Sequence, residues 1–206
     1  SATGAPGSEV ERALLSAVDF AETPSDILNV AARLEDVGSD AAALRLCKQV
    51  ARLDANRREP YVMGLRLAER LGKTDELVWA CKGVLSQAWP KEFQPVVEKA
   101  SLLARSTYAE LLENGKTEEA AKFGEELKRA PAQDVVIRVS WTGDADIDLS
   151  VEEPGGTVCS LENRSSAGGG TLLGDSYPGE GDDPSGMISE TYKCPRGFNG
   201  QYRLLV

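Results

Sequence analysis

Three aspartates at alternate positions are the residues of this chain whose types and spacing most suggest chemistry. Asp144, Asp146 and Asp148 alternate with apolar residues up to Val151. Successive side chains of a β-strand point to opposite faces, so the pattern predicts a strand with a buried apolar face and an acidic face. Like charges on one face repel each other, so the row needs a bound cation, a nearby arginine or full solvation.

Calcium is the cation that this row fits, because Ca²⁺ accepts roughly six to eight oxygen ligands in flexible geometry. One strand cannot supply that many oxygens, so further carboxylates would have to come from a neighbouring loop. The candidate ligands for a calcium site are therefore Asp144, Asp146, Asp148 and Asp175, with Asp182 or Asp183 as other completing residues.

A simpler interpretation of the row needs no metal. The segment is not an EF-hand loop, because Leu149 stands where that loop requires Gly and Gly155 where it requires Glu. A polar strand edge neutralised by Arg138 or Arg164 explains the same residues, since surface carboxylates are commonly paired. Calcium binding and a polar edge both stay open at this point.

The composition excludes several classes of protein. The 206 residues include no histidine, which removes the commonest general base and the usual zinc ligand. A net charge of −10 without a basic patch argues against a nucleic-acid or anionic-membrane partner. No apolar run approaches the roughly 20 residues of a membrane-spanning helix. An enzyme on this chain would have to use carboxylates alone, as glycoside hydrolases do.

Residues 8–130 predict an α-helical repeat region. Three aligned segments each open with a glycine that would end one helix, followed by a polar and acidic start of the next; they begin at Gly38, Gly72 and Gly115. The first two glycines are 34 residues apart and the next two 43. A helical unit of about 34 residues is typical of tetratricopeptide arrays, which this region resembles. The resemblance implies an extended surface for a protein or peptide partner.

The repeat also explains two sequences that look like phosphate-binding loops. Gly72-Lys73-Thr74 and Gly115-Lys116-Thr117 match the end of that motif, but its earlier glycine is missing from both. We therefore predict that both are turns that start a helix. Cys47 and Cys81 occupy equivalent repeat positions, and we expect them to be small buried packing residues.

Residues 134–206 change to a period of two and predict short antiparallel strands. Val135, Ile137 and Val139 alternate with other residues, and glycine-rich turns follow at short intervals. Short strands with frequent turns are typical of an antiparallel β-sandwich or barrel. The predicted fold class is α+β in two segregated domains, a helical repeat at 8–130 and a β-sandwich at 134–206.

The order of motifs in this second region carries a family resemblance. Trp141 precedes Asp144-Ala-Asp-Ile-Asp-Leu-Ser-Val-Glu-Glu-Pro-Gly-Gly156, and Asn163-Arg-Ser-Ser-Ala-Gly-Gly169 follows, with Asp175, Glu190 and Gly200-Gln-Tyr-Arg-Leu204 beyond it. The region resembles the YfaP-like domain of unknown function, an uncharacterised bacterial family. That resemblance implies a β-sandwich of an exported or envelope protein. The family usually continues with more strands, so we expect the sandwich to be incomplete at Val206.

The two remaining cysteines have two interpretations. Cys159 and Cys194 both lie in the predicted sandwich. In an exported protein a disulfide between them fits an oxidising compartment and would stiffen a glycine-rich domain. Two free thiols in the core are the alternative, because sequence alone does not establish the geometry that a disulfide needs.

These observations together predict a binding protein and not an enzyme. The expected function is a non-catalytic protein-binding or scaffolding module of a bacterial envelope or exported protein, with a calcium site in the sandwich. The expected location is extracytoplasmic. The alternatives are a carboxylate-only enzyme such as a glycoside hydrolase, or a purely structural spacer.

Overall fold

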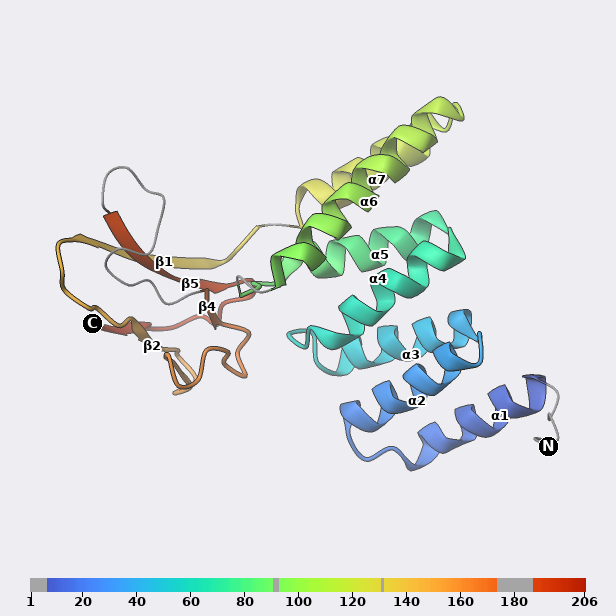
Figure 1. Ribbon diagram of the computed structural model, residues 1–206, viewed down its shortest axis with the longest axis horizontal. Helices are drawn as coiled ribbons and strands as arrows, with labels where there is room; N and C mark the ends of the chain where they lie inside the picture. Colours follow the sequence, from blue (N-terminus) through green and yellow to red (C-terminus); the bar gives the residue numbers. More distant parts are fainter. Residues whose placement is uncertain (1–6, 91–92, 131, 174–186) are drawn as a thin grey trace. The chain divides into compact units, whose positions relative to one another are not determined.

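The computed structural model describes residues 7–90, 93–130, 132–173 and 187–206 (Figure 1). Helices precede strands along the chain, so the coarse prediction of a helical N-terminal part and a β-rich C-terminal part is confirmed. The chain divides into two compact units. One contains the residues up to Leu85 and Lys99–Lys128, and the other contains Ser86–Glu98 and Arg129–Val206.

Seven α-helices and one short 3-10 helix make up the helical part in the residues that the structure describes. They are α1 (Gly7–Ala17), η1 (Val18–Phe20), α2 (Pro24–Asp36), α3 (Asp40–Leu53), α4 (Glu59–Leu71), α5 (Thr74–Ser86), α6 (Gln94–Glu113) and α7 (Thr117–Lys128). Figure 1 shows successive helices folding back on one another as antiparallel pairs.

The helix ends follow from local sequence. Thr23 and Asp26 form a capping box at the start of α2: the Thr23 hydroxyl accepts a hydrogen bond from the Asp26 N–H at 3.2 Å, and the Asp26 carboxylate accepts one from the Thr23 N–H at 2.8 Å. Gly38, Gly72 and Gly115 have φ of 77°, 62° and 71°, the left-handed conformation of a helix-ending glycine. The predicted glycine stops are confirmed, and both Gly-Lys-Thr sequences are helix-starting turns.

Two glycines allow α4 and α5 to approach closely. A Cβ on Gly64 would lie 2.4 Å from the ring of Trp79, and a Cβ on Gly83 would lie 2.0 Å from the ring of Tyr61. Each helix therefore presents a glycine to an aromatic ring of the other. Packing of this kind, and not intrinsic helix propensity, accounts for most of the stability of such helices.

Cys47 and Cys81 are fully buried, as expected for packing residues. Burial raises the pKa of each thiol to about 12, with a smaller contribution from nearby carboxylates. Both thiols therefore stay neutral at physiological pH, which agrees with a packing role.

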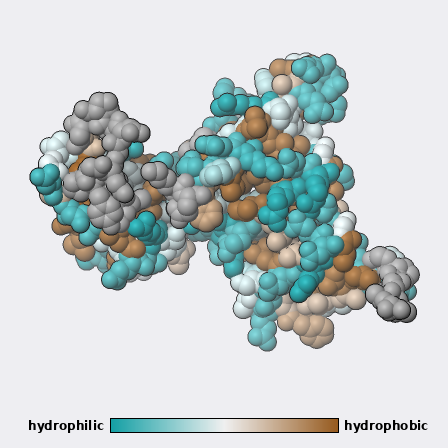
Figure 2. Space-filling view, viewed as in Figure 1, coloured by the Kyte–Doolittle hydropathy of each residue, from teal (hydrophilic) through white to brown (hydrophobic). Residues whose placement is uncertain are grey.

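Ion pairs link each helix pair to the next on the surface of the helical part. Lys48 of α3 pairs with Glu76 of α5, and 34 residues later Lys82 of α5 pairs with Glu126 of α7 at 2.5 Å. Arg70 of α4 binds Glu35 and Asp40, while Lys99 of α6 pairs with Glu69 of α4 at 2.6 Å. Figure 2 shows hydrophilic side chains over much of the visible face of these helices, with smaller hydrophobic patches between them.

The C-terminal part contains two small antiparallel sheets of three strands each. The strands are β1 (Val135–Thr142), β2 (Ser150–Glu152), β3 (Val158–Cys159), β4 (Thr171–Leu172), β5 (Met187–Cys194) and β6 (Arg203–Leu205). The strand orders are β1-β5-β4 and β3-β2-β6. The longest pairing joins β1 to β5, from Val135 opposite Cys194 to Thr142 opposite Met187.

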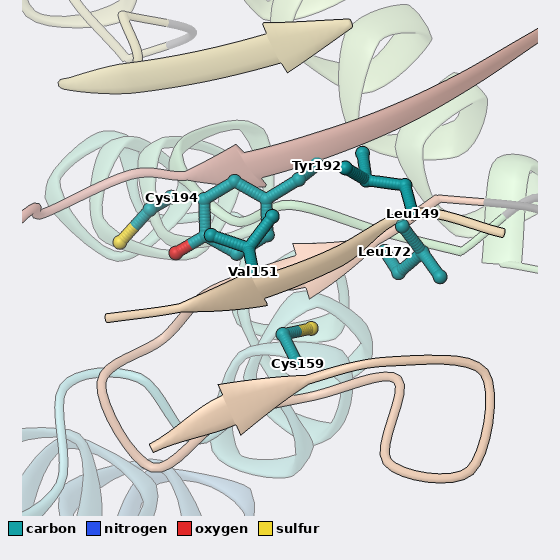
Figure 3. Close-up of a cluster of buried hydrophobic side chains, with 6 residues drawn as sticks. All are labelled: Leu149, Val151, Cys159, Leu172, Tyr192 and Cys194. Atoms are coloured by element: carbon teal, nitrogen blue, oxygen red, sulfur yellow. The ribbon is translucent and has the colours of Figure 1, made fainter. Parts of the chain in front are cut away.

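The two sheets contribute side chains to one apolar cluster, drawn in Figure 3. Its buried members are Leu149, Val151, Cys159, Leu172, Tyr192 and Cys194. Val135, Ile137 and Val139 of β1 are half-buried and pack against the cluster, as their alternation predicted. The apolar period of two therefore located the core of this part of the chain.

Candidate functional site

The acidic row lies just before β2 and not within a strand. Asp144, Asp146 and Asp148 are exposed, whereas Ile147 is half-buried and Leu149 is buried. The predicted separation of acidic and apolar side chains is therefore correct, but β2 begins only at Ser150. Like charges at alternate positions disfavour a regular strand, and the exposure of the three carboxylates to solvent reduces their repulsion.

Two contacts hold the acidic segment in place. The Trp141 indole N–H donates to the Ala145 carbonyl at 2.8 Å, and the Leu149 N–H donates to the Glu190 carboxylate at 2.6 Å. Glu190 is only 1% exposed, so its contact with the backbone is shielded from water. Glu190 thus fixes the end of the segment, a role that its place in the sequence did not reveal.

The predicted calcium ligands are only partly described. Asp144, Asp146 and Asp148 lie in one segment, while Asp175, Asp182 and Asp183 fall outside the described residues. In the described ranges, no three acidic, cysteine or histidine side chains gather closely enough to hold a metal ion. Arg138, a predicted neutralising residue, donates from Nε to the Thr191 hydroxyl at 3.2 Å. The calcium site therefore stays a prediction.

Cys159 and Cys194 are both free thiols, and both are buried. They are the free thiols of one of the two interpretations, and the disulfide stays a prediction. Cys159 lies on β3 in one sheet and Cys194 on β5 in the other, and the Cys194 thiol contacts the Gly168 carbonyl at 3.6 Å. Burial raises the pKa of Cys194, which favours the neutral thiol.

A second buried carboxylate, Glu153, follows β2 and accepts hydrogen bonds from two hydroxyls. It is 3% exposed, and its Oε1 accepts hydrogen bonds from the Tyr192 hydroxyl at 2.7 Å and the Ser166 hydroxyl at 2.5 Å. Burial, together with the hydrogen bond to Glu153, raises the pKa of Tyr192 far above its usual value. The phenol therefore stays protonated and donates to the carboxylate.

The glycine-rich loop makes room for this carboxylate. A Cβ on Gly168 or Gly170 would lie 2.3 Å or 2.2 Å from a Glu153 oxygen. The motif around Asn163 is thus part of the loop between β3 and β4, and this loop closes over a buried acid. The sequence signal was a run of glycines after Ser166, which marked a loop but did not identify the acid it encloses.

An open groove lies between α5 and α7 of the helical part, with a volume of about 790 Å³. Its apolar base is formed by Val78, which is half-buried, and Phe123, which is 2% exposed. Charged and polar residues from the start of α5 and from along α7, with the residue before each helix, form its rim: Lys73, Thr74, Asp75, Glu76, Lys116, Glu119, Lys122 and Glu126. The groove was not predicted, because it depends on how α5 and α7 pack.

Three of the acidic side chains on this rim already have lysine partners. Glu76 pairs with Lys48, Glu126 with Lys82 at 2.5 Å, and Glu119 with Lys116 at 3.3 Å. An apolar base with a polar rim is the usual composition of a binding site for a peptide or small molecule. The groove is therefore the candidate binding site of the helical part.

Comparisons with known proteins identify no relative. No protein-family model, no curated protein and no solved structure matches the chain. The likeness to tetratricopeptide repeats and to the YfaP-like domain therefore rests on the sequence motifs alone. Among the described helices, none is both long and apolar enough to cross a membrane.

Proposed function

We propose that this chain is a non-catalytic protein-binding module of a bacterial envelope or exported protein. In this proposal the helices form a tetratricopeptide-like array that binds a segment of a partner protein. The two small sheets are the layers of a YfaP-like β-sandwich. The envelope location follows from that resemblance, as does the calcium site at the acidic segment.

The groove between α5 and α7 is the observation that carries the proposal. It offers about 790 Å³ with an apolar base and a charged rim. An open groove of this kind can take apolar side chains of a partner while the rim provides specificity. A purely structural spacer would not need such a groove.

Two features support a repeat architecture. Helix-ending glycines recur at Gly38, Gly72 and Gly115. Lysines 34 residues apart, Lys48 and Lys82, each make an ion pair to the next helix pair. Repeats that contact mainly their neighbours build extended binding surfaces, which agrees with a partner-binding role.

The sandwich proposal is supported by the shared apolar cluster. Val151 and Cys159 come from one sheet, and Leu172, Tyr192 and Cys194 from the other. Side chains from two sheets that fill a common core are typical of sandwich packing. The buried carboxylates Glu153 and Glu190 then act as structural anchors and not as an acid–base pair.

Peptide selection followed by a matched pair of variants tests the proposed function. Peptides of about 12 residues, the scale of short recognition segments, would be selected from a random display library on the purified chain. Their affinities would then be measured by fluorescence anisotropy. We expect Val78→Glu to weaken binding at least about tenfold, since a charge would enter the apolar base.

Val62→Glu provides the control, because Val62 is a half-buried valine of α4 outside the groove lining. This variant should bind the selected peptides like the wild type. Circular dichroism melts would show that both variants are folded. Failure to select any peptide, or equal binding by both variants, would contradict the proposed function at this groove.

A further inference from the structure

Two lysines on the groove rim differ from most of the other charged residues there because they form no ion pair with a described residue. Lys73 and Lys122 are exposed and line the groove. Neither forms an ion pair with another described residue, whereas Lys116 pairs with Glu119. A lysine that is held near a groove without a carboxylate partner is available to bind an anion.

The position of Lys73 is not explained by helix stability. It immediately precedes α5, which begins at Thr74. The N-terminus of a helix carries partial positive charge, so a cation there is unfavourable. The acidic residues of the first turn, Asp75 and Glu76, are by contrast where the helix dipole favours them.

Among the charged lining side chains that form no ion pair within the described residues, there are two lysines, Lys73 and Lys122, and one acid, Asp75. Glu76, Glu119 and Glu126 are paired with lysines, and Asp75 is stabilised by the N-terminus of α5. The whole lining contains three lysines and four carboxylates, so the two unpaired lysines are a local feature of the groove. Two lysines without a carboxylate partner favour a ligand that supplies carboxylates.

We propose that the groove binds an acidic peptide segment of a partner protein. Carboxylates of the segment pair with Lys73 and Lys122, and an apolar side chain packs on Val78 and Phe123. This inference rests on the proposed function, because it specifies the chemistry of the partner. The ion pairs would provide orientation and selectivity, and the apolar contact would provide much of the affinity.

Three matched pools of synthetic peptides test the proposal. Each pool contains peptides of about 12 residues built from Leu, Ala, Gly and one variable residue, which is Glu, Gln or Lys. We expect the Glu pool to bind the wild type about tenfold more tightly than the Gln pool, as two exposed ion pairs would provide. This preference should decline as salt is raised from low to physiological ionic strength.

A charge-reversal variant makes the test specific to the two lysines. Lys73→Glu combined with Lys122→Glu should remove the preference for the Glu pool and create one for the Lys pool. Arg45→Glu combined with Arg105→Glu changes the net charge equally at exposed positions outside the groove lining. This control should keep the wild-type preference, and melting curves would confirm that both double variants are folded.

The outcomes separate this inference from the proposed function. If all pools bind with equal affinity and Val78→Glu weakens them, the groove binds peptides but the acidic preference is wrong. If the preference for Glu survives reversal of both lysines, another surface causes it, and the inference is again wrong. If no pool binds and library selection also fails, the proposed function fails at this groove and the inference fails with it.

Discussion

The carboxylates of the helical part and those of the sheet part differ in burial and in the partners that they bind. In the helical part, Glu35, Asp40 and Glu126 pair with arginine or lysine at the surface between helices. In the sheet part, Glu153 and Glu190 are buried and accept hydrogen bonds from hydroxyls or the backbone. Carboxylates thus form surface ion pairs in the helical part and buried hydrogen bonds in the sheet part.

The difference follows from the size of each core. The helices bury long apolar stripes, so their surface ion pairs contribute little to the free energy of unfolding. Apart from β1 and β5, the strands that the structure describes have only two or three residues, and their ladders provide few hydrogen bonds. Buried polar contacts then hold the loops that connect the strands, and each contact is costly to break.

The largest effect is therefore expected at Glu153. Glu153→Ala leaves the Tyr192 and Ser166 hydroxyls without their acceptor and opens a cavity. We expect the sheet part to lose about 3 kcal/mol of unfolding free energy. Amide hydrogen exchange resolves the two parts, and protection should fall in β2 and β5 while α2 and α3 keep theirs.

The adjacent residue supplies the control for this prediction. Glu152 is half-buried, and its one side-chain ion pair within the described residues is with Arg203, at 3.4 Å. Glu152→Ala should cost less than about 1 kcal/mol, as expected of a surface pair. Equal losses in the two variants, or a loss of protection in the helices as well, would contradict the contrast between the two parts.

A smaller effect is expected at Arg70 in the helical part. Its hydrogen bonds to Asp40, at 2.8 and 2.9 Å, hold the pKa of that carboxyl below its usual value. Burial alone would raise the pKa of Glu35, but hydrogen bonds from Arg66 and Arg70 outweigh it and lower the pKa. Arg70→Gln should cost about 1 kcal/mol at neutral pH.

The pH dependence of this loss has a definite sign. Carboxyls with lowered pKa bind protons more weakly when folded, so their stabilisation is present above about pH 4 and lost as the pH falls further. The Arg70 variant should lose less stability than the wild type between neutral and acidic pH. Urea denaturation at several pH values measures this, with Arg33→Gln as control because Arg33 meets Asp36 only at 4.0 Å. Identical acid profiles for the wild type and the Arg70 variant would contradict the prediction.

The helical part was predictable because its signals are local. A glycine that ends a helix adopts the left-handed conformation, as at Gly38. Thr23 and Asp26 form the N-terminal cap of α2. The groove was not predictable, since Val78 and Phe123 come from helices about 40 residues apart in the chain. Their approach depends on how the helices pack, which the periodicity of one sequence does not contain.

The sheet part shows where sequence patterns become ambiguous. Alternation around Asp146 correctly separated exposed from buried side chains but overestimated the strand, which begins at Ser150. The sequence does not show that Glu153 and Glu190 are buried, because charged residues usually lie at the surface. Only the fold shows that Tyr192 and the Leu149 backbone amide face them.

The smallest effect on stability is expected at the acidic segment, whose carboxylates are exposed, unlike those of Glu153 and Glu190. Asp146→Asn removes one of three neighbouring like charges without touching the core. With a chelator present, we expect the melting temperature to stay within about 1–2 °C of the wild-type value and to shift upwards, because repulsion decreases. Differential scanning calorimetry measures this shift.

Melting curves with and without calcium test whether this segment binds the ion. An ion that binds only the folded state stabilises it by mass action, by about 2.7 kcal/mol at 100 times the dissociation constant. If the proposed calcium site exists, millimolar calcium raises the wild-type midpoint, and Asp146→Asn and Asp148→Asn each abolish most of the rise. Glu162→Gln, an exposed acid outside the segment, should keep the rise. An unchanged wild-type midpoint in calcium would eliminate the metal site, leaving a solvated acidic segment that Glu190 and Trp141 hold in place.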